Sequence, residues 1–221
     1  MKLLMAINVS ASSEKVGDLS MSKKWNTSVI YDTENDGGGT FIAPDYYYTI
    51  SSKYNKVFNN CLEWCAGPGF IGYNLLEKQV VKKISFLEIA DSPIENLKET
   101  SASLDNKNIN IYQGNELNCI PKQQFDLIVG NPPHFLSNVD NQFDGLDQRI
   151  YMDPEWNIHK SFFQQVENYL TDDGVVLLIE NSTESNTDLF DQLLEDTNLQ
   201  VTNTYKFSAE VPLYYIEIRK K

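Results

Sequence analysis

Three glycines and one glutamate in this sequence have the spacing of a nucleotide-binding turn. Gly67, Gly69 and Gly72 form the pattern G-x-G-x-x-G, which follows the apolar run Cys61–Cys65. Glu88 lies at the end of the next apolar run. Such glycines let a strand turn sharply into a helix and bring backbone N–H groups close to a ligand, while the carboxylate can accept hydrogen bonds from ribose hydroxyls. Taken alone, the pattern is equally consistent with glycines that only allow a strand and a helix to pack closely.

A second candidate group is the tetrad Asn131-Pro132-Pro133-His134, which follows the apolar run Phe125–Val129. The asparagine side chain offers both a hydrogen-bond acceptor and donors, whereas two prolines fix the backbone and remove donors. The tetrad follows a strand in the same way as the glycine turn does, and the carboxyl ends of parallel strands form the ligand-binding edge of α/β sheets. We therefore expect the tetrad to face the glycine turn.

The order of these features resembles the class I S-adenosylmethionine (SAM) methyltransferases, in the branch with an (N/D)-P-P-(Y/F/W) tetrad. The order is Glu63-x-Cys65-x-Gly67-x-Gly69, then Glu88, then Gly114-Asn115, then Phe125 to Pro133. Within it, Glu88 to Asn96 looks like the ribose-binding segment of the HemK/PrmC-like or "small-domain" enzymes. The resemblance, which covers about Asn60 to Glu180, implies SAM as cofactor and S-adenosylhomocysteine (SAH) as product.

The resemblance also implies a role for each matching residue. Glu63 would receive the ammonium group of the cofactor or orient the glycine loop, although a bracing contact with the helix is the structural alternative. Glu88 would bind the ribose hydroxyls and Asn115 the adenine edge. The side-chain oxygen of Asn131 and the carbonyl of Pro132 would accept hydrogen bonds from a planar NH₂ group. The full expected cofactor set is Glu63, Cys65, Ala66, Gly67, Gly69, Glu88, Ile89, Asn115, Glu116 and Asn131, and the catalytic set is Asn131, Pro132, Pro133 and His134.

The expected substrate-binding residues are His134, Phe135 and Arg149. His134 departs from the family pattern, in which the fourth place holds an aromatic residue that stacks on the substrate. An imidazole can still stack and can also form a hydrogen bond, or Phe135 takes over the stacking role. Arg149 lies in the mostly acidic loop Asn138–Trp156, where it is either a substrate clamp or a partner for the neighbouring acids. An acidic loop favours a basic or neutral partner over a phosphate, unless the loop is simply solvated.

Regular alternation of strands and helices must position these residues. Apolar runs predict strands at Cys61–Cys65, Ile84–Ala90, Ile109–Tyr112, Phe125–Val129 and Gly174–Ile179. Helical patterns lie between and after them, at Ile71–Val80, Pro93–Leu104, Pro154–Leu170 and Thr187–Asp196. Two β-rich runs, Leu199–Phe207 and Val211–Arg219, predict a closing antiparallel pair. The fold class is therefore α/β with helices on both faces of a mostly parallel sheet. The family resemblance implies a Rossmann-like sheet of seven strands in the order 3-2-1-4-5-7-6.

The whole chain, residues 1–221, is expected to form one methyltransferase domain. We interpret residues 1–50 as an N-terminal extension and residues 60–221 as the catalytic core. The aromatic segment Thr40–Ile50 occupies the place of a cofactor lid in the resembling enzymes, and core packing is its alternative interpretation. The preceding glycine run, Asp36–Gly39, indicates a mobile loop or a tight backbone contact.

Composition limits the classes of partner and compartment. The chain of 221 residues has 18 basic and 31 acidic residues and a net charge of −13, so its overall field repels polyphosphate. No run is long enough to span a membrane, and the first residues do not form a signal peptide, so we expect a cytoplasmic protein. Three cysteines are expected to be reduced, and two histidines give little support for a metal cluster. A protein substrate or partner subunit is therefore favoured over nucleic acid.

The leading hypothesis is a SAM-dependent N-methyltransferase acting on a planar amide or amino nitrogen, most plausibly a protein glutamine side chain. The first alternative is methylation of adenine N6 or guanine N2 in RNA or DNA, which would need an aromatic platform and a basic path for the strand. Others are a small-molecule N-methyltransferase and a non-catalytic SAM-binding subunit. A nicotinamide-dinucleotide module could use the glycines and Glu88 but would leave the Asn-Pro-Pro tetrad unexplained.

Overall fold

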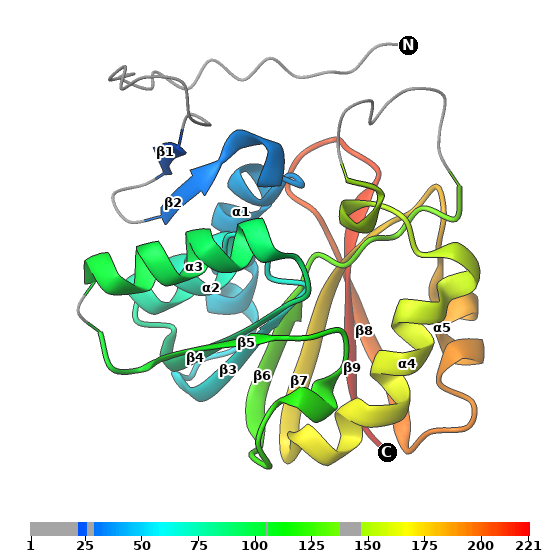
Figure 1. The fold of residues 1–221 in the computed structure, drawn as a ribbon. Coiled ribbons are helices and arrows are strands. Elements are labelled where there is room, and N and C mark those ends of the chain that lie inside the picture. Colours follow the sequence, from blue (N-terminus) through cyan, green and yellow to red (C-terminus); the bar gives the residue numbers. More distant parts are fainter. Residues whose placement is uncertain (1–21, 26–28, 105, 138–146) are drawn as a thin grey trace.

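A seven-stranded sheet forms the centre of the protein (Figure 1). The computed structural model describes residues 22–25, 29–104, 106–137 and 147–221. The strand order is β5-β4-β3-β6-β7-β9-β8. Strands β3 to β7 are parallel, and β9 lies antiparallel to both β7 and β8. The strands are β3 (Phe58–Trp64), β4 (Val81–Glu88), β5 (Ile109–Gln113), β6 (Phe125–Gly130), β7 (Leu170–Asn181), β8 (Leu199–Lys206) and β9 (Leu213–Lys220). Numbered from β3 as the first, this is the order 3-2-1-4-5-7-6, so the expected topology is confirmed.

Helices cover both faces of the sheet. In Figure 1, α1, α2 and α3 lie on the left of the sheet, and α4 and α5 lie on the right. The interior between sheet and helices is apolar on both sides, and each side forms its own cluster of buried residues. The helices are α1 (Gly39–Lys53), α2 (Phe70–Glu77), α3 (Asp91–Leu104), α4 (Asn157–Val166) and α5 (Thr187–Leu193), with short 3₁₀ turns η1 (Thr33–Asn35), η2 (Leu117–Cys119), η3 (Gln148–Ile150), η4 (Pro154–Trp156) and η5 (Glu167–Tyr169).

The helix predicted over Pro154–Leu170 is wrong in its extent, because the chain breaks it into η4, α4 and η5. Glu155 and Trp156 have φ values of 58° and 59°, in the left-handed region that interrupts a right-handed helix. The break lets the ring of Trp156 be buried while α4 begins at Asn157. Asp153 precedes Pro154, which occupies the first turn of η4, where proline is tolerated because its missing N–H has no helical partner.

The aromatic segment Thr40–Ile50 lies within α1 and packs into the core. Ile42, Tyr46 and Ile50 are buried, and the Tyr46 hydroxyl, a single donor, lies within hydrogen-bond distance of the carbonyls of Gly130 (2.5 Å) and Leu177 (3.0 Å). This hydroxyl ties α1 to two central strands, which is the core-packing alternative to a lid. The preceding glycines, Gly37 and Gly39, reach the pocket described below.

A hairpin of β1 (Ser22–Trp25) and β2 (Val29–Asp32) attaches the N-terminal part of the described chain to α3. The backbone N–H of Ile30 donates to Thr100 Oγ1 (2.9 Å), and that of Asp32 donates to Asn96 Oδ1 (3.2 Å). Asn35 also reaches α3, because its Nδ2 donates to Asn96 Oδ1 at 2.8 Å. Residues 29–35 therefore pack against α3.

Three further features bear on the sequence predictions. Cys61 is buried, Cys65 is partly buried and Cys119 is exposed, and all three are free thiols. In the part of the chain that the structure describes, no helix has the length and apolarity needed to cross a membrane. Among the same residues, no group of three or more His, Cys, Asp or Glu side chains is placed to hold a metal ion.

Candidate functional site

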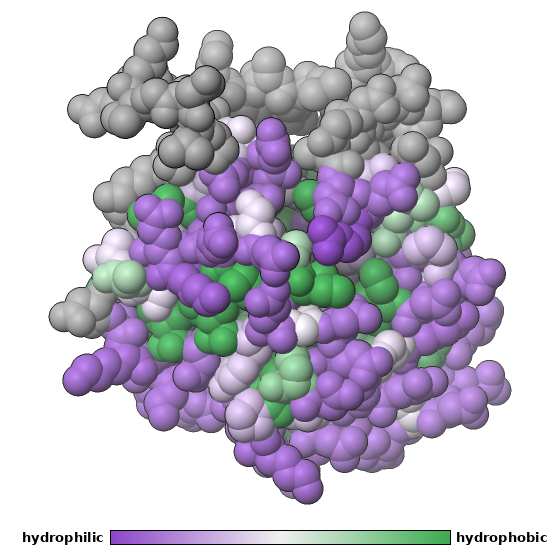
Figure 2. Space-filling view, in the orientation of Figure 1, coloured by the Kyte–Doolittle hydropathy of each residue, from purple (hydrophilic) through white to green (hydrophobic). Residues whose placement is uncertain are grey.

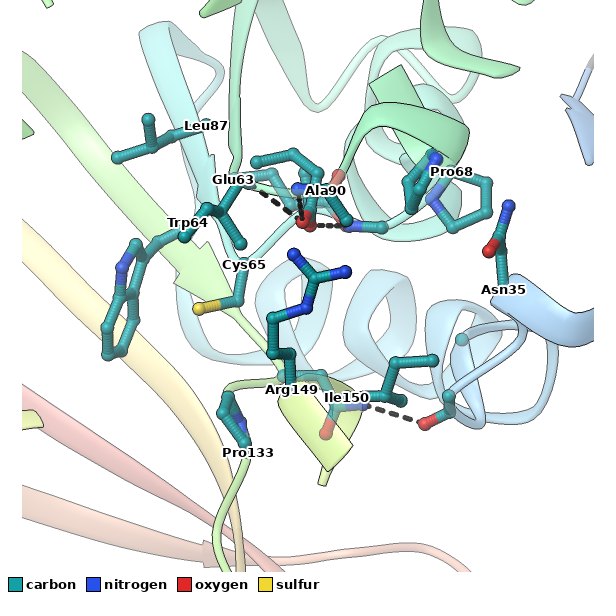
Figure 3. Close-up of a pocket in the computed structure, with 18 of the residues that line it drawn as sticks. Asn35, Glu63, Trp64, Cys65, Pro68, Leu87, Ala90, Pro133, Arg149 and Ile150 are labelled. Carbon is teal, nitrogen blue, oxygen red and sulfur yellow. Dashed lines mark hydrogen bonds between the residues drawn. The ribbon is translucent and has the colours of Figure 1, made fainter. Parts of the chain in front are cut away.

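A cavity of about 300 Å³ opens at the carboxyl ends of β3, β4 and β6 (Figure 3). Strand register brings the predicted segments together, because Trp64 of β3 pairs with Leu87 of β4 on one side and with Gly130 of β6 on the other. Cys65, Glu88 and Asn131 follow directly and therefore meet at one edge. Ten of the predicted residues line the cavity: Glu63, Cys65, Ala66, Gly67, Glu88, Ile89, Asn115, Asn131, Pro133 and Arg149.

The face of the molecule shown in Figure 2 is mixed in character, with hydrophobic residues near the middle surrounded by hydrophilic ones. Ile89 is an exposed large hydrophobic residue that lines the cavity. Such a side chain can cover the flat face of a planar ligand.

Glycine is required where the loop turns into α2. Gly69 has φ +85°, and a Cβ there would lie 2.6 Å from Leu97 Cδ2 and 2.8 Å from Phe86 Cε1. Gly67 has φ +51°, but a Cβ there would meet only the Asn35 carbonyl, at 3.8 Å. Gly67 therefore lies on the cavity side, whereas Gly69 permits close packing behind it and does not line the cavity.

Glu63 braces the start of α2. It is 2% exposed, and its carboxylate accepts hydrogen bonds from the N–H groups of Ile71 (3.3 Å) and Gly72 (2.6 Å). Burial raises the pKa of Glu63 to about 8, against the lowering effect of these two N–H donors. The bracing alternative from the sequence is thus present in the structure, and the same carboxylate also faces the cavity.

Glu88 joins the glycine turn to the segment after β4. Its Oε2 accepts from the Gly67 N–H (2.8 Å), and its Oε1 accepts from the N–H groups of Ile89 (2.8 Å) and Ala90 (2.9 Å). An ionised carboxylate has about four lone-pair positions, so acceptor capacity remains on the cavity side. A buried carboxylate held by backbone donors suits ligand hydroxyls, because it can accept from them without moving.

The loop after β5 contributes one of its two predicted residues. Asn115 lines the cavity beside Gly114, whose N–H donates to the Glu88 carbonyl at 2.9 Å. Glu116 points elsewhere, because its carboxylate accepts from Asn118 Nδ2 (2.7 Å) and faces Ser161 on α4. Glu116 is therefore not among the residues that line the cavity.

The amide of Asn131 is oriented by the N-terminal extension. Its Nδ2 donates a hydrogen bond to the Gly37 carbonyl at 3.0 Å, which directs the Oδ1 atom the other way. Pro132 and Pro133 are buried, and Pro133 lines the cavity beside Asn131. The tetrad therefore places a fixed acceptor oxygen at the edge of the cavity.

His134 and Phe135 were expected to bind the substrate, but neither residue lines the cavity. The Phe135 ring is 8% exposed, and its backbone pairs with the Tyr151 carbonyl (2.9 Å) and the Asp153 N–H (2.9 Å), so it packs inward. His134 is partly buried, and its Nδ1 has no hydrogen-bond partner among the described residues. Burial, with a smaller effect of the nearby His159 charge, lowers the pKa of His134 to about 4, so its ring is neutral at physiological pH.

Arg149 reaches the cavity from η3. Figure 3 shows its side chain extending into the cavity toward Ala90 and Cys65. Its Nη2 and Nε bind the Asp147 carboxylate, with Nε to Oδ2 at 2.9 Å. Arg149 therefore lines the cavity, as a substrate clamp would, and also pairs with a neighbouring acid, as the alternative interpretation predicts. Residues 138–146 of the acidic loop lie outside the described residues.

A buried network of Asp153, His159 and Glu180, which the sequence did not predict, lies on the far side of the tetrad from the glycine turn. All three side chains are 0% exposed. One signal could have found Glu180, because it ends an apolar strand as Glu88 does, and a buried carboxylate is costly without a partner. His159 gave no comparable signal. Asn35, Trp64 and Ile150 were missed as well, and all three line the cavity.

Comparison with known proteins identifies a family whose model matches this chain. The model described as "Methyltransferase small domain" matches residues 48–209. A curated relative, "Type II methyltransferase M2.MboI" of Moraxella bovis, is 29% identical over 121 residues. That alignment covers 49% of this chain and 44% of the relative, so the chain matches less than half the length of this protein.

Solved structures share the fold at low sequence identity. A ribosomal protein L11 methylase from Lactobacillus delbrueckii subsp. bulgaricus has a TM-score of 0.61 at 16% identity, covering 83% of this chain and 81% of that one. A putative RNA methyltransferase from Pyrococcus horikoshii has a TM-score of 0.59 at 14% identity, covering 82% and 85%. At these identities the likeness establishes the fold.

Proposed function

Because the chain belongs to the methyltransferase small domain family and is a SAM-dependent methyltransferase, we propose that it methylates a planar amide or amino nitrogen, specifically a protein glutamine side chain. The observation that carries this proposal is the orientation of Asn131. Its Nδ2 is held by the Gly37 carbonyl, which leaves Oδ1 as the end that receives a donor. The NH₂ group of a carboxamide has two such donors, one for Asn131 Oδ1 and one for the Pro132 carbonyl.

The residues of the cavity suit the cofactor's functional groups. Glu88 retains acceptor positions for the ribose hydroxyls, and Asn115 lies beside it for the adenine edge. Glu63 faces the cavity with a carboxylate that can ionise in response to a cationic group. When bound, SAM supplies an activated methyl group.

The chain's own contribution to the reaction is orientation. Asn131 and the Pro132 carbonyl hold the acceptor NH₂ in its plane so that the nitrogen lone pair points toward the methyl group. Holding reactants in line contributes about 7–11 kcal/mol to lowering the barrier in favourable cases.

Charge favours a protein substrate. The net charge of −13 repels a polyphosphate chain. Arg149 is already bound to Asp147, so its positive charge is balanced by a neighbouring carboxylate. A basic or neutral protein surface meets no such repulsion.

A second candidate is methylation of adenine N6 or guanine N2 in nucleic acid. The same two acceptors suit the exocyclic amino group of a base, and the similarity to a Type II methyltransferase favours this candidate. The ring of Phe135 is turned inward, however, and His134 does not line the cavity, so the platform for a flipped base would have to come from another residue.

Transfer of labelled methyl from SAM into a fractionated lysate tests the proposal. Label should enter a protease-sensitive fraction, and peptide mass spectrometry should place the added methyl on glutamine. Asn131→Ala should lower transfer about 100-fold while SAH still binds, because orientation of the acceptor is lost and the contacts of Gly67 and Glu88 with the cofactor are kept. Asn118→Ala, at an exposed asparagine outside the cavity, is the matched control. Unchanged transfer by Asn131→Ala would remove the tetrad from the mechanism, and nuclease-sensitive label would establish the second candidate instead.

A further inference from the structure

Three charged or titratable side chains form a continuous hydrogen-bonded line beneath the tetrad. His159 Nδ1 lies 2.7 Å from Asp153 Oδ2, and His159 Nε2 lies 3.1 Å from Glu180 Oε1. Asp153 precedes η4, His159 is in the first turn of α4, and Glu180 is near the end of β7. The line therefore links a loop, a helix and a central strand through side chains that water does not reach.

Asp153 connects this line to the tetrad. Its N–H donates to the Phe135 carbonyl at 2.9 Å, and the Phe135 N–H donates to the Tyr151 carbonyl at 2.9 Å. Its carboxylate accepts from the N–H groups of Ile158 (2.8 Å) and His159 (3.1 Å) as well as from the His159 ring. Phe135 follows His134 directly, so the exit of the tetrad is fixed to α4 and, through His159, to β7.

Aromatic rings surround the line and keep it dry. The His159 ring lies 5.5 Å from the Trp64 ring and 5.1 Å from the Trp156 ring, in edge-to-face contacts. Phe163 and Phe190 lie about 6 Å from it on the other sides. Trp64 also lines the cavity, so only one layer of side chains separates the line from the site.

Charges facing the line come from every neighbouring element. Burial would lower the pKa of His159, but the carboxylates of Glu180 and Asp153 outweigh it and raise that pKa to about 9. Glu180 has its pKa raised by burial, and its Oε2 has no partner among the described residues. Cys65 follows β3, and burial together with the nearby carboxylates raises its pKa, so it stays a thiol. On the tetrad, burial and, to a smaller extent, the His159 charge lower the pKa of His134.

We propose that Asp153, His159 and Glu180 form a buried anchor that positions the Asn131-to-His134 loop against the methyl acceptor. Its link to the acceptor rests on the proposed function, whereas the anchoring of the loop does not. A buried ionic network is a poor source of stability compared with apolar packing, so its place under the tetrad indicates a role in orientation. These are positioning residues, because they act through Phe135 and His134.

Hydrogen exchange tests the anchoring directly. In Glu180→Gln and His159→Gln, the Phe135 and Asp153 amides should lose about tenfold or more of their protection relative to the mean of the core amides. Glu217→Gln is the matched control, because Glu217 is 2% exposed, binds Tyr205 Oη (2.6 Å) and Arg219 Nε (2.7 Å), and lies away from the cavity. Protection at Phe135 that falls no more than in this control would overturn the anchor.

The two histidines make a second test simple, since the sequence contains only His134 and His159. NMR titration of labelled histidine should show one ring protonated up to about pH 9 and one neutral down to about pH 4. In Glu180→Gln, the His159 pKa should fall, because one of the two carboxylates that raise it is lost. A His159 pKa that does not change in this variant would overturn the contact between His159 and Glu180 on which the anchor depends.

Activity separates this proposal from the proposed function. With the acceptor fraction identified above, Glu180→Gln should lower kcat about 10- to 100-fold with SAH affinity unchanged, as expected for misplacement of a reacting group. His159→Gln should behave alike, and Glu217→Gln should retain kcat. If the wild-type protein methylates no glutamine, the proposed function fails, while the exchange and titration results still decide the anchor. Retained kcat in both anchor variants would limit the network to a structural role.

Discussion

Replacement of Glu88 by glutamine separates cofactor binding from loop bracing. The carboxylate accepts from three backbone N–H groups, those of Gly67, Ile89 and Ala90. A glutamine amide has only one oxygen. If that oxygen takes the Oε1 position, the Ile89 and Ala90 bonds remain and the NH₂ group faces the Gly67 N–H, donor against donor. Loss of one hydrogen bond to a charged group costs about 1.5–3 kcal/mol, so the free energy of unfolding should fall by about that amount.

The free energy of cofactor binding should become less favourable by a similar amount. Ribose hydroxyls would lose a charged acceptor, and about 1.5–3 kcal/mol corresponds to about 10- to 100-fold weaker SAH binding. Isothermal titration calorimetry with SAH measures the affinity, and urea unfolding measures the stability. Asp91→Asn is the control, because Asp91 lines the same cavity and its Oδ1 accepts from Gln113 Nε2 (2.6 Å) at the surface, a bond that asparagine can keep.

SAH affinity and stability, measured together, can refute the ribose-binding role of Glu88. We expect Asp91→Asn to bind SAH within about twofold of the wild type and to unfold at the same urea concentration, because exposed polar contacts contribute little. Unchanged SAH affinity in Glu88→Gln, together with reduced stability, would show that Glu88 only braces the glycine turn. The ribose-binding role would then be wrong.

Two further predictions concern the same loop and strand. Gly69→Ala should lower the free energy of unfolding, measured with urea, by about 2–5 kcal/mol, because left-handed backbone strain adds to a clash with Leu97. Gly38→Ala is the control, since Gly38 has φ +92° with open space around it, and it should cost only about 1–2 kcal/mol. Equal losses in the two variants would contradict the packing contribution. The protonated form of Glu63 is favoured in the folded state, so its contribution to stability is complete below its ordinary pKa of 4.5 and is lost as pH rises through about 8. Glu63→Gln cannot titrate, and its stability relative to the wild type should therefore rise between about pH 5 and pH 8; a constant difference would refute the raised pKa.

Local sequence was sufficient for the sheet and for much of the cavity. Apolar runs bounded by turn residues placed β3 to β7, because buried parallel strands need continuous apolar sequence. Gly67, Glu88 and Asn131 could be assigned to one edge because each follows a strand, and parallel strands end at the same edge. The strand order itself came from the family resemblance.

Local sequence was less informative where distant segments meet. From the sequence, Thr40–Ile50 was interpreted as a lid or as core packing and no helix was predicted there, since Pro44 and the glycines before it hide a helix that is stabilised by burial of Tyr46. Phe135 was expected as a possible stacking residue, yet pairing with residues 151–153 turns it inward. In both cases packing against a remote partner outweighed the local pattern.

The sequence by itself determined which residue types follow each strand, and with them the family and most of the residues that line the cavity. Only the tertiary structure decided how those residues are held. Asn131 is oriented by Gly37, and His159 lies between Asp153 and Glu180. These contacts join residues far apart in the chain, and their geometry follows from strand register and helix packing rather than from spacing. A periodic pattern can place a side chain on an edge or a face, but the partner of a buried polar group depends on which remote segment fills the adjacent space.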